Sequence, residues 1–111
     1  MATTQKVVTH LWFDDGAEDA AKFYTSLLPN SKIDAVTHFD HGKNLYGVVF
    51  TLDGQEYRAL NAGPTYKLSP AVSLWIKCDD QKELDRIWDA ILKNGGKEQA
   101  CGWISDKWGL S

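Results

Sequence analysis

The sequence predicts an α+β domain of paired βαβββ modules that form a mixed, curved sheet around a cleft, with the second module incomplete in this chain. Two stretches, 8–30 and 72–94, each have the pattern of a strand that runs into a helix. Their helices align at Ala20 with Leu84, Phe23 with Ile87, Tyr24 with Trp88, Leu27 with Ile91, Leu28 with Leu92 and Asn30 with Asn94. We interpret them as one unit used twice. The alternative is that any two strand–helix units look alike.

The repeat sets the predicted module limits. We place the first module at 1–64 and the second at 65–111, within one structural domain overall. Three strand patterns follow the first helix, but only residues 97–111 follow the second, so we expect the second module to stop after its second or third strand. The missing strands are either absent, disordered or supplied by a partner. An open sheet edge of this kind favours assembly.

Composition and charge narrow the class of protein. The 111 residues are 43% hydrophobic and 24% charged, which suits one globular core. A net charge of −3 predicts no nucleic-acid partner. The apolar runs are too short to span a bilayer and no signal segment follows the N-terminus, so we predict a cytoplasmic protein without a membrane partner. Cys78 and Cys101 lack a close metal or redox spacing and are expected to be reduced.

The first half has the pattern β-α-β-β-β. Residues 6–13 alternate as a strand, and Asp14-Asp15-Gly16 forms a turn that can cap a helix. Apolar residues at helical spacing continue to Leu28, where Pro29 stops the helix. Alternation then predicts three strands, at 32–39, 45–52 and 55–62. The Asp53-Gly54 pair before the last strand is a strong hairpin signal.

The second half begins in the same way. We predict a strand at 71–78, and a helix that starts after Asp79-Asp80 and ends at Gly95-Gly96. A further strand is predicted from Lys97 to Ile104, and another begins at Trp108 after a short turn.

Strand alternation predicts where a ligand would bind. Helices on one face of the sheet leave the other face open, and the apolar positions expected beneath the helices are Leu11, Phe13, Val72, Leu74 and Ile76. The open face then carries Val8, His10 and Trp12 from one half, and Ser73, Trp75 and Lys77 from the other. A cleft with one tryptophan from each half suits a small organic ligand. The alternative is that this face packs on a second sheet or chain.

Other chemistry leaves weaker signals. The chain has no phosphate-binding loop, dinucleotide fingerprint or nucleophile elbow. Of the three histidines, His10 is the candidate metal ligand because it lies on the open face, although a single strand histidine is more often a structural residue. Glu56 is a candidate carboxylate partner. Cys101 is a candidate reactive thiol, although a buried, inert cysteine is commoner.

Several motifs together resemble one family over nearly the whole chain. They are Leu11-Trp12-Phe13-Asp14, Phe23-Tyr24, Pro29-Asn30-Ser31-Lys32, Ala59-Leu60-Asn61-Ala62-Gly63-Pro64, Cys101-Gly102-Trp103 and Asp106-Lys107-Trp108-Gly109. On these residues the chain resembles the vicinal oxygen chelate superfamily, which includes glyoxalase I, the bleomycin-resistance proteins and the extradiol dioxygenases. Within it, the chain is similar to the PhnB-like branch labelled "3-demethylubiquinone-9 3-methyltransferase domain". Members of that branch continue further, so the resemblance implies that this chain ends early.

The resemblance implies paired modules around a U-shaped cleft, commonly in a homodimer. Metal-using members place ligands on the opening strand and the last strand of each half. The matching position on the opening strand is Val8 in the first half, with His10 two residues further along the same face, and Ser73 in the second half. The last strand of the first half, 55–62, has Tyr57, Ala59 and Asn61 on the face that would hold a metal ligand, and none of them is a carboxylate. A full metal triad is therefore not visible, and no Gly-rich turn matches the S-adenosylmethionine site that the label implies.

We therefore expect a small-molecule-binding protein that acts as a homodimer, with no assigned cofactor or catalytic residue. The expected ligand-binding residues are Trp12, Trp75 and Trp103 as apolar walls, and His10, Asn61 and Ser73 as polar contacts. Two other hypotheses stay open. One is a metal-dependent isomerase or lyase of the glyoxalase type, in which His10 binds a divalent metal. The other is a non-catalytic assembly module whose open face is an interface.

Overall fold

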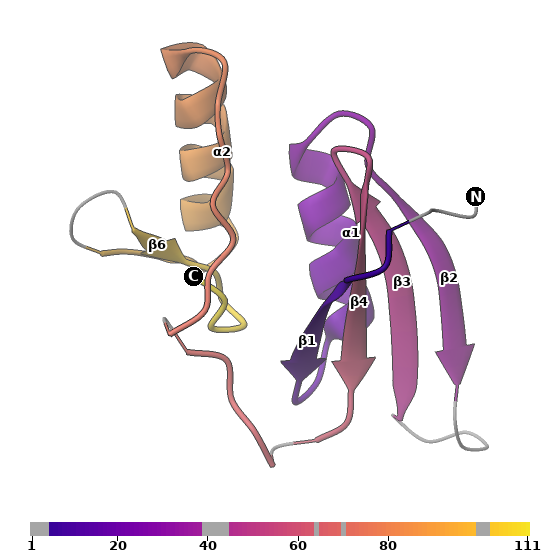
Figure 1. The fold of residues 1–111 in the computed structure, drawn as a ribbon. Helices are drawn as coiled ribbons and strands as arrows, with labels where there is room; N and C mark the ends of the chain where they lie inside the picture. Colours follow the sequence, from indigo (N-terminus) through magenta and orange to yellow (C-terminus); the bar gives the residue numbers. More distant parts are fainter. Residues whose placement is uncertain (1–4, 39–44, 64, 70, 100–102) are drawn as a thin grey trace. The chain divides into compact units, whose positions relative to one another are not determined.

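The chain forms two compact units, Met1–Lys67 (unit 1) and Leu68–Ser111 (unit 2), each described here by itself (Figure 1). The computed structural model describes residues 5–38, 45–63, 65–69, 71–99 and 103–111. A four-stranded mixed sheet and two helices confirm the predicted α+β class. None of the helices in these ranges is long and apolar enough to cross a membrane.

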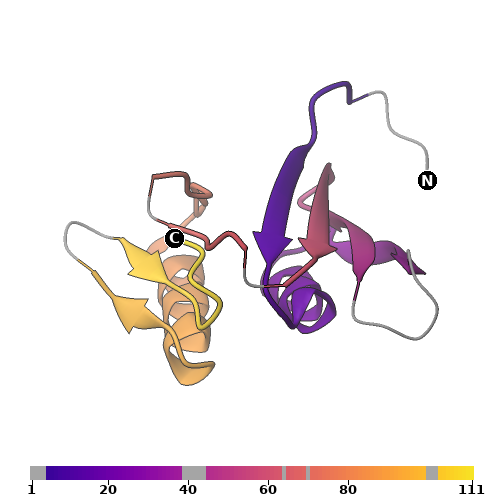
Figure 2. The same ribbon diagram turned by 90° about the horizontal axis from the view of Figure 1, so that it is seen from below.

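Unit 1 has the predicted β-α-β-β-β order. Its elements are β1 (Thr9–Phe13), α1 (Ala17–Leu27), β2 (Lys32–His38), β3 (Tyr46–Leu52) and β4 (Gln55–Asn61). The strand order is β1-β4-β3-β2, with β1 parallel to β4 and the other neighbours antiparallel. Helix α1 lies along one face of this sheet (Figures 1 and 2).

The core of unit 1 lies between α1 and the sheet. Leu11 and Phe13 are buried, as strand alternation predicted, and Val48 and Phe50 are the largest fully buried apolar side chains. The helix contributes Ala17, Ala20, Ala21, Tyr24 and Leu27. Its alanines let the helix backbone approach the sheet closely, so that Tyr24 contacts Phe50 with ring centroids 6.2 Å apart.

The hairpin between β3 and β4 closes as the Asp53-Gly54 pair predicted. Leu52 pairs with Gln55, which leaves a two-residue loop. Asp53 and Gly54 have φ angles of 48° and 80°, as a type I′ turn requires. The loop is held to the connection between α1 and β2, because Gly54 N–H donates to Asn30 O at 3.0 Å and Asp53 N–H donates to Ser31 Oγ at 3.0 Å.

Unit 2 contains α2 (Gln81–Lys93), β5 (Lys97–Glu98) and β6 (Ile104–Ser105), and the two short strands pair antiparallel. Helix α2 ends in a Schellman motif, in which Gly96 N–H donates to Ile91 O at 2.9 Å and Gly95 N–H donates to Leu92 O at 3.2 Å. A Cβ at Gly96 would lie 2.6 Å from Ser105 O. Glycine at this position therefore allows the end of α2 to pack on β6.

Three strand predictions in unit 2 are wrong. Residues 71–78 run without strand pairing, the predicted strand 97–104 is divided between β5 and β6, and Trp108 lies in a turn. The alternating pattern at 72–76 is present, but a strand also needs a ladder of backbone partners. Leu74 N–H donates to Ser111 O at 3.0 Å, which among the described residues is a single bond rather than a ladder. At Trp108, Asp106 Oδ1 accepts from the backbone N–H groups of Trp108 and Leu110 and stabilises a turn.

Candidate functional site

The six residues expected to bind a ligand fall in different units. Unit 1 holds His10, Trp12 and Asn61, and unit 2 holds Ser73, Trp75 and Trp103. The three residues of unit 2 line one pocket, whereas those of unit 1 lie on both faces of its sheet.

Asn61 is a structural residue of the core in unit 1. Its side chain is 0% exposed, and its Oδ1 accepts a hydrogen bond from Ala17 N–H at 3.0 Å. The next N–H of the helix, that of Glu18, donates to the Tyr46 hydroxyl at 3.1 Å. Helix N-termini carry N–H groups without intrahelical partners, and Gly16 at the N-cap provides no side-chain bond. The sheet therefore caps α1 through Asn61 and Tyr46.

His10 and Trp12 lie on the sheet face opposite α1, as alternation predicted. Trp12 Nε1–H donates to Gly63 O at 2.9 Å, and its ring meets Tyr66 edge to face at 5.0 Å. His10 is exposed and pairs in register with Arg58 on β4. This face of unit 1 therefore combines one partly buried aromatic ring with a histidine beside a guanidinium.

The surroundings of His10 do not fit a divalent metal. Its strand neighbour Arg58 carries a fixed positive charge, and Arg58 Nε binds Glu56 Oε2 at 2.8 Å. The candidate carboxylate is thus engaged by a cation. Within the described residues, no three His, Cys, Asp or Glu side chains are grouped so that they could hold a metal ion.

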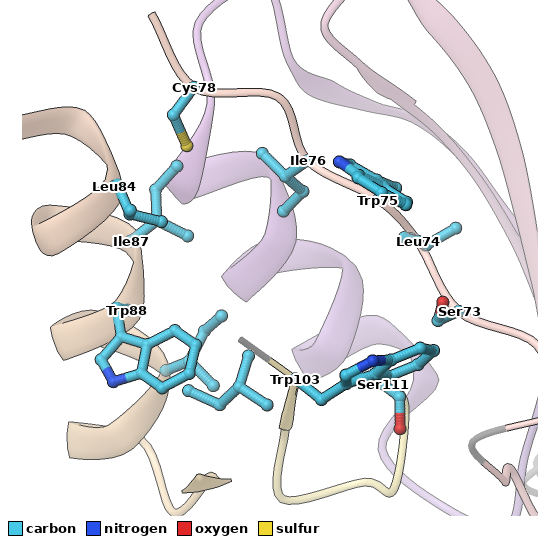
Figure 3. Close-up of a pocket in the computed structure, with 12 residues that line it drawn as sticks. Ser73, Leu74, Trp75, Ile76, Cys78, Leu84, Ile87, Trp88, Trp103 and Ser111 are labelled. Carbon is cyan, nitrogen blue, oxygen red and sulfur yellow. The ribbon is translucent and has the colours of Figure 1, made fainter. Parts of the chain in front are cut away.

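Unit 2 contains an apolar pocket of about 220 Å³ (Figure 3). Its walls come from segment 73–78, helix α2, the start of β6 and the last residue, Ser111. The lining residues are Ser73, Leu74, Trp75, Ile76, Cys78, Leu84, Ile87, Trp88, Ile91, Trp103, Ile104 and Ser111. Trp75 is 89% exposed and Trp103 is 42% exposed, so both reach the rim, while Ile87 is buried at the base.

Helix α2 presents its apolar side to this pocket, and both of its ends are fixed by capping hydrogen bonds. Asp80 Oδ1 accepts from Glu83 N–H at 2.8 Å, and Glu83 Oε1 accepts from Asp79 N–H at 2.9 Å, which together form a reciprocal cap. From this start, Leu84, Ile87, Trp88 and Ile91 follow at helical spacing. Trp88 Nε1–H donates to Glu98 Oε1 at 3.0 Å, so the indole is held in place and presents its apolar ring atoms.

Cys78 places a protonated thiol at the pocket wall. Burial raises the pKa of Cys78 above its ordinary value of 9.0, and the neighbouring carboxylates of Glu83 and Asp79 raise it further. Figure 3 shows its sulfur on the same side of segment 73–78 as Ile76, facing α2. The thiol is therefore a small apolar group of the lining at neutral pH. Cys101, the other candidate thiol, lies outside the described residues.

Sequence reasoning missed Trp88 and Cys78 as pocket residues. Trp88 aligns with Tyr24 in the repeat and was considered only as part of the helix, and Cys78 was noted for its redox state alone. The apolar residues of α2 at helical spacing were an available signal for Trp88, because they need a surface to pack against and the strands β5 and β6 are short. The position of Cys78, next to the cap of α2, could not be related to the pocket before the path of 73–78 was known.

Comparisons with known proteins are consistent with this architecture. The sequence model described as 3-demethylubiquinone-9 3-methyltransferase matches residues 5–111. A Bacillus cereus structure described as "Putative 3-demethylubiquinone-9 3-methyltransferase, PhnB protein" is 28% identical, with a TM-score of 0.81 over 96% of this chain and 95% of that chain. A Staphylococcus aureus protein is 27% identical over 98% of this chain and 93% of that chain, with a TM-score of 0.48. None of the curated proteins compared matches the sequence.

Proposed function

Because this chain belongs to the 3-demethylubiquinone-9 3-methyltransferase family and is PhnB-like, we propose that it is a small-molecule-binding protein whose ligand occupies the pocket of unit 2. The observation that supports this function most directly is the pocket itself. Three tryptophans, at positions 75, 88 and 103, line one apolar hollow of about 220 Å³. Concave sites with aromatic walls and few polar groups are typical of small organic ligands.

The family description names methyl transfer, but the described residues do not fit a nucleoside-type methyl donor. Such donors usually bind at a glycine-rich turn between a strand and a helix, where free N–H groups point at the ligand. The β1–α1 turn leads to N–H groups that are already bonded to Asn61 and Tyr46. The start of α2 is capped by Asp80. We therefore derive no methyl-transfer step for this chain.

The exposed apolar surface of unit 2 favours a second property, assembly into a homodimer. Val72 is 67% exposed and Leu84 41% exposed, in addition to the tryptophans at the pocket rim. Large exposed apolar surface of this kind usually marks an interaction site. A second copy that covers the rim, in the manner of the vicinal oxygen chelate superfamily that the sequence resembles, would enclose the ligand. The pocket and the interface would then lie at different depths of one surface.

Fragment screening by NMR tests the binding function. The five indole N–H signals, assigned with single Trp→Phe variants, report on the pocket at Trp88 and Trp103 and on unit 1 at Trp12. We expect apolar fragments to shift the signals of Trp88 and Trp103 and to leave that of Trp12 in place. Hits that shift only Trp12, or no hits at all, would contradict the proposal.

A matched pair of variants locates the binding. We expect Trp103→Ala to weaken the binding of a confirmed fragment by about tenfold, because it removes one aromatic wall. Tyr66→Ala removes an exposed aromatic side chain of unit 1 outside the pocket and is expected to leave the affinity unchanged. Native mass spectrometry of the same samples gives the oligomeric state. A monomer at micromolar concentration would contradict the homodimer and leave the pocket hypothesis intact.

A further inference from the structure

We infer that the ligand of this pocket is an uncharged, flat molecule of one or two fused aromatic rings that carries one hydroxyl or carbonyl group. The inference rests on the proposed function and adds the chemical class of the ligand. Three properties of the pocket lead to it: the charge of its lining, its size, and the placement of its aromatic and hydroxyl groups.

The side chains of the lining offer no ion-pair partner to a charged ligand. None of the twelve side chains that line the pocket carries a charge at neutral pH, and Cys78 contributes a protonated thiol. Two side chains carry hydroxyls, Ser73 and Ser111, and the others are apolar or aromatic. A carboxylate or ammonium group placed here would lose its hydration without gaining an ion-pair partner from the wall. The free-energy cost of that transfer is several kcal/mol at least.

The size of the pocket sets the number of rings. An engineered cavity of about 150 Å³, lined by leucine, isoleucine and phenylalanine side chains, stays dry and binds benzene. The present pocket measures about 220 Å³ and is open at its rim. It therefore has room for a second fused ring, while a larger polycyclic molecule would extend over the exposed Trp75 into solvent.

The placement of the tryptophans favours a flat molecule. Figure 3 shows Trp88 on the α2 side and Trp103 on the other side of the hollow. The Trp88 N–H is already bonded to Glu98, so that its ring contributes apolar contact rather than a hydrogen bond. Aromatic rings against tryptophan gain about 0.5–1.5 kcal/mol beyond their area burial, which a saturated molecule of equal size does not.

The hydroxyl of Ser73 defines one polar end. Ser73 and Ser111 are neighbours, because Leu74 N–H donates to Ser111 O at 3.0 Å. Ser111 Oγ is buried and has no hydrogen-bond partner among the described residues. Buried polar atoms without a partner are rare, because each costs free energy until it is satisfied. Because Ser111 Oγ is closed to solvent, a ligand in the pocket would meet the partly exposed Ser73 at this end. A single hydroxyl or carbonyl of the ligand would pair with the Ser73 hydroxyl.

Calorimetric titration with three matched compounds tests the class. The probes are 2-naphthol, its anionic analogue 2-naphthoate, and the saturated analogue decahydro-2-naphthol. We expect 2-naphthol to bind at least about tenfold more tightly than either of the others. Equal affinity for the saturated alcohol would overturn the aromatic class, and tighter binding of 2-naphthoate would overturn the uncharged class. In both cases a ligand still binds, so the proposed function survives.

The serine variants test the polar end. We expect Ser73→Ala to reduce the preference for 2-naphthol over naphthalene by about three- to tenfold, with little change in naphthalene affinity. Ser69→Ala, an exposed serine of the same unit that does not line the pocket, is the control and should change neither affinity. An unchanged preference in Ser73→Ala would overturn the assigned polar end. If all three probes fail while other fragments still shift Trp103, the inferred class is wrong and the function stands. If no fragment binds, both fall.

Discussion

Units 1 and 2 start from the same strand–helix pattern and differ in how much apolar surface they bury. In unit 1, five residues of α1 are buried against a sheet whose strands are 5 to 7 residues long. In unit 2, Ile87 is the buried residue of α2, and the paired strands of its described part are 2 residues each. An amphipathic helix needs an extended surface against its apolar side. Where the sheet is short, that side becomes a pocket wall.

The largest expected difference between the units concerns amide exchange. Every residue of β3 is paired with β4, and most are also paired with β2, whereas segment 72–77 has the isolated bond from Leu74. We expect β3 amides to exchange about 10³-fold more slowly than those of 72–77, Leu74 excepted. Hydrogen–deuterium exchange read by NMR measures this ratio. Equal protection would mean that 72–77 is a paired strand in solution, as its alternation predicts.

Phe50→Ala tests how far the stability of unit 1 depends on its closed core. Phe50 is 0% exposed and packs against Tyr24 on α1. Its truncation leaves a cavity, so we expect the free energy of unfolding to fall by about 3–5 kcal/mol in urea titration. Val7→Ala, at a position 85% exposed, is the control and should change it by less than about 0.5 kcal/mol. A loss below about 1 kcal/mol for Phe50→Ala would contradict the described core.

Asn61→Ala tests whether Asn61 is a cap of α1 rather than a ligand contact. The variant leaves the buried Ala17 N–H without its partner, and we expect a loss of about 1–3 kcal/mol in the same titration. Asp15→Ala removes an exposed bond to Gly16 N–H beside the same helix end and should cost under about 0.5 kcal/mol. If Asn61→Ala keeps its stability and loses fragment binding, the original expectation for Asn61 is correct and the capping role is secondary.

The smallest expected effect is a change in the rate at which the Cys78 thiol is alkylated. Glu83→Gln keeps the acceptor oxygen for Asp79 N–H but removes a charge that raises the pKa of the Cys78 thiol. We expect the pKa to fall and iodoacetamide to react roughly two- to threefold faster at pH 8, in a Cys101→Ser background. Asp89→Asn, on α2 but not among the charges that act on Cys78, should leave the rate unchanged.

The same pKa shift gives the sign of a pH dependence. Because the folded protein holds the thiol proton more tightly than the unfolded chain, the stabilising contribution is complete below pH 9.0. This contribution is lost as the pH rises through the raised pKa of Cys78 in the folded state. A stability that increases above pH 9.0 in the Cys101→Ser background, after correction with a Cys78→Ser variant, would contradict the direction of the shift.

Sequence reasoning recovered unit 1 almost completely because its signals are local and agree with one another. Alternation placed Leu11 and Phe13 in the core, and Asp53-Gly54 defined the hairpin. The same reasoning placed Val72 and Ile76 beneath a helix, which is wrong for Val72, since 67% of its surface is exposed, whereas Ile76 lines the pocket. Alternation assigns a residue to a face, but it does not show whether anything covers that face.

The expected site residues were also placed with unequal success by sequence reasoning. Ser73, Trp75 and Trp103 line the pocket of unit 2, together with Trp88, which was not among the expected ligand-binding residues. Asn61 was expected to contact a ligand because strand 55–62 offers it at a position that matches the ligand-bearing face of the resembled superfamily. The structure buries it beneath α1, because residue 61 alternates onto the helix face with Ala59. His10 and Trp12 keep the predicted open face, and their part in ligand binding stays a prediction.

The sequence by itself determined the elements whose physics is local: the periodicity and caps of α1 and α2, the hairpin turn, and the α+β class with its βαβββ module. Tertiary structure alone decided which backbone and side-chain groups found partners. It capped α1 from β4 and β3, left 71–78 without a ladder, and turned the stripe of α2 into the wall of a pocket. Periodicity depends on neighbours along the chain, whereas burial and pairing depend on residues that are distant in sequence.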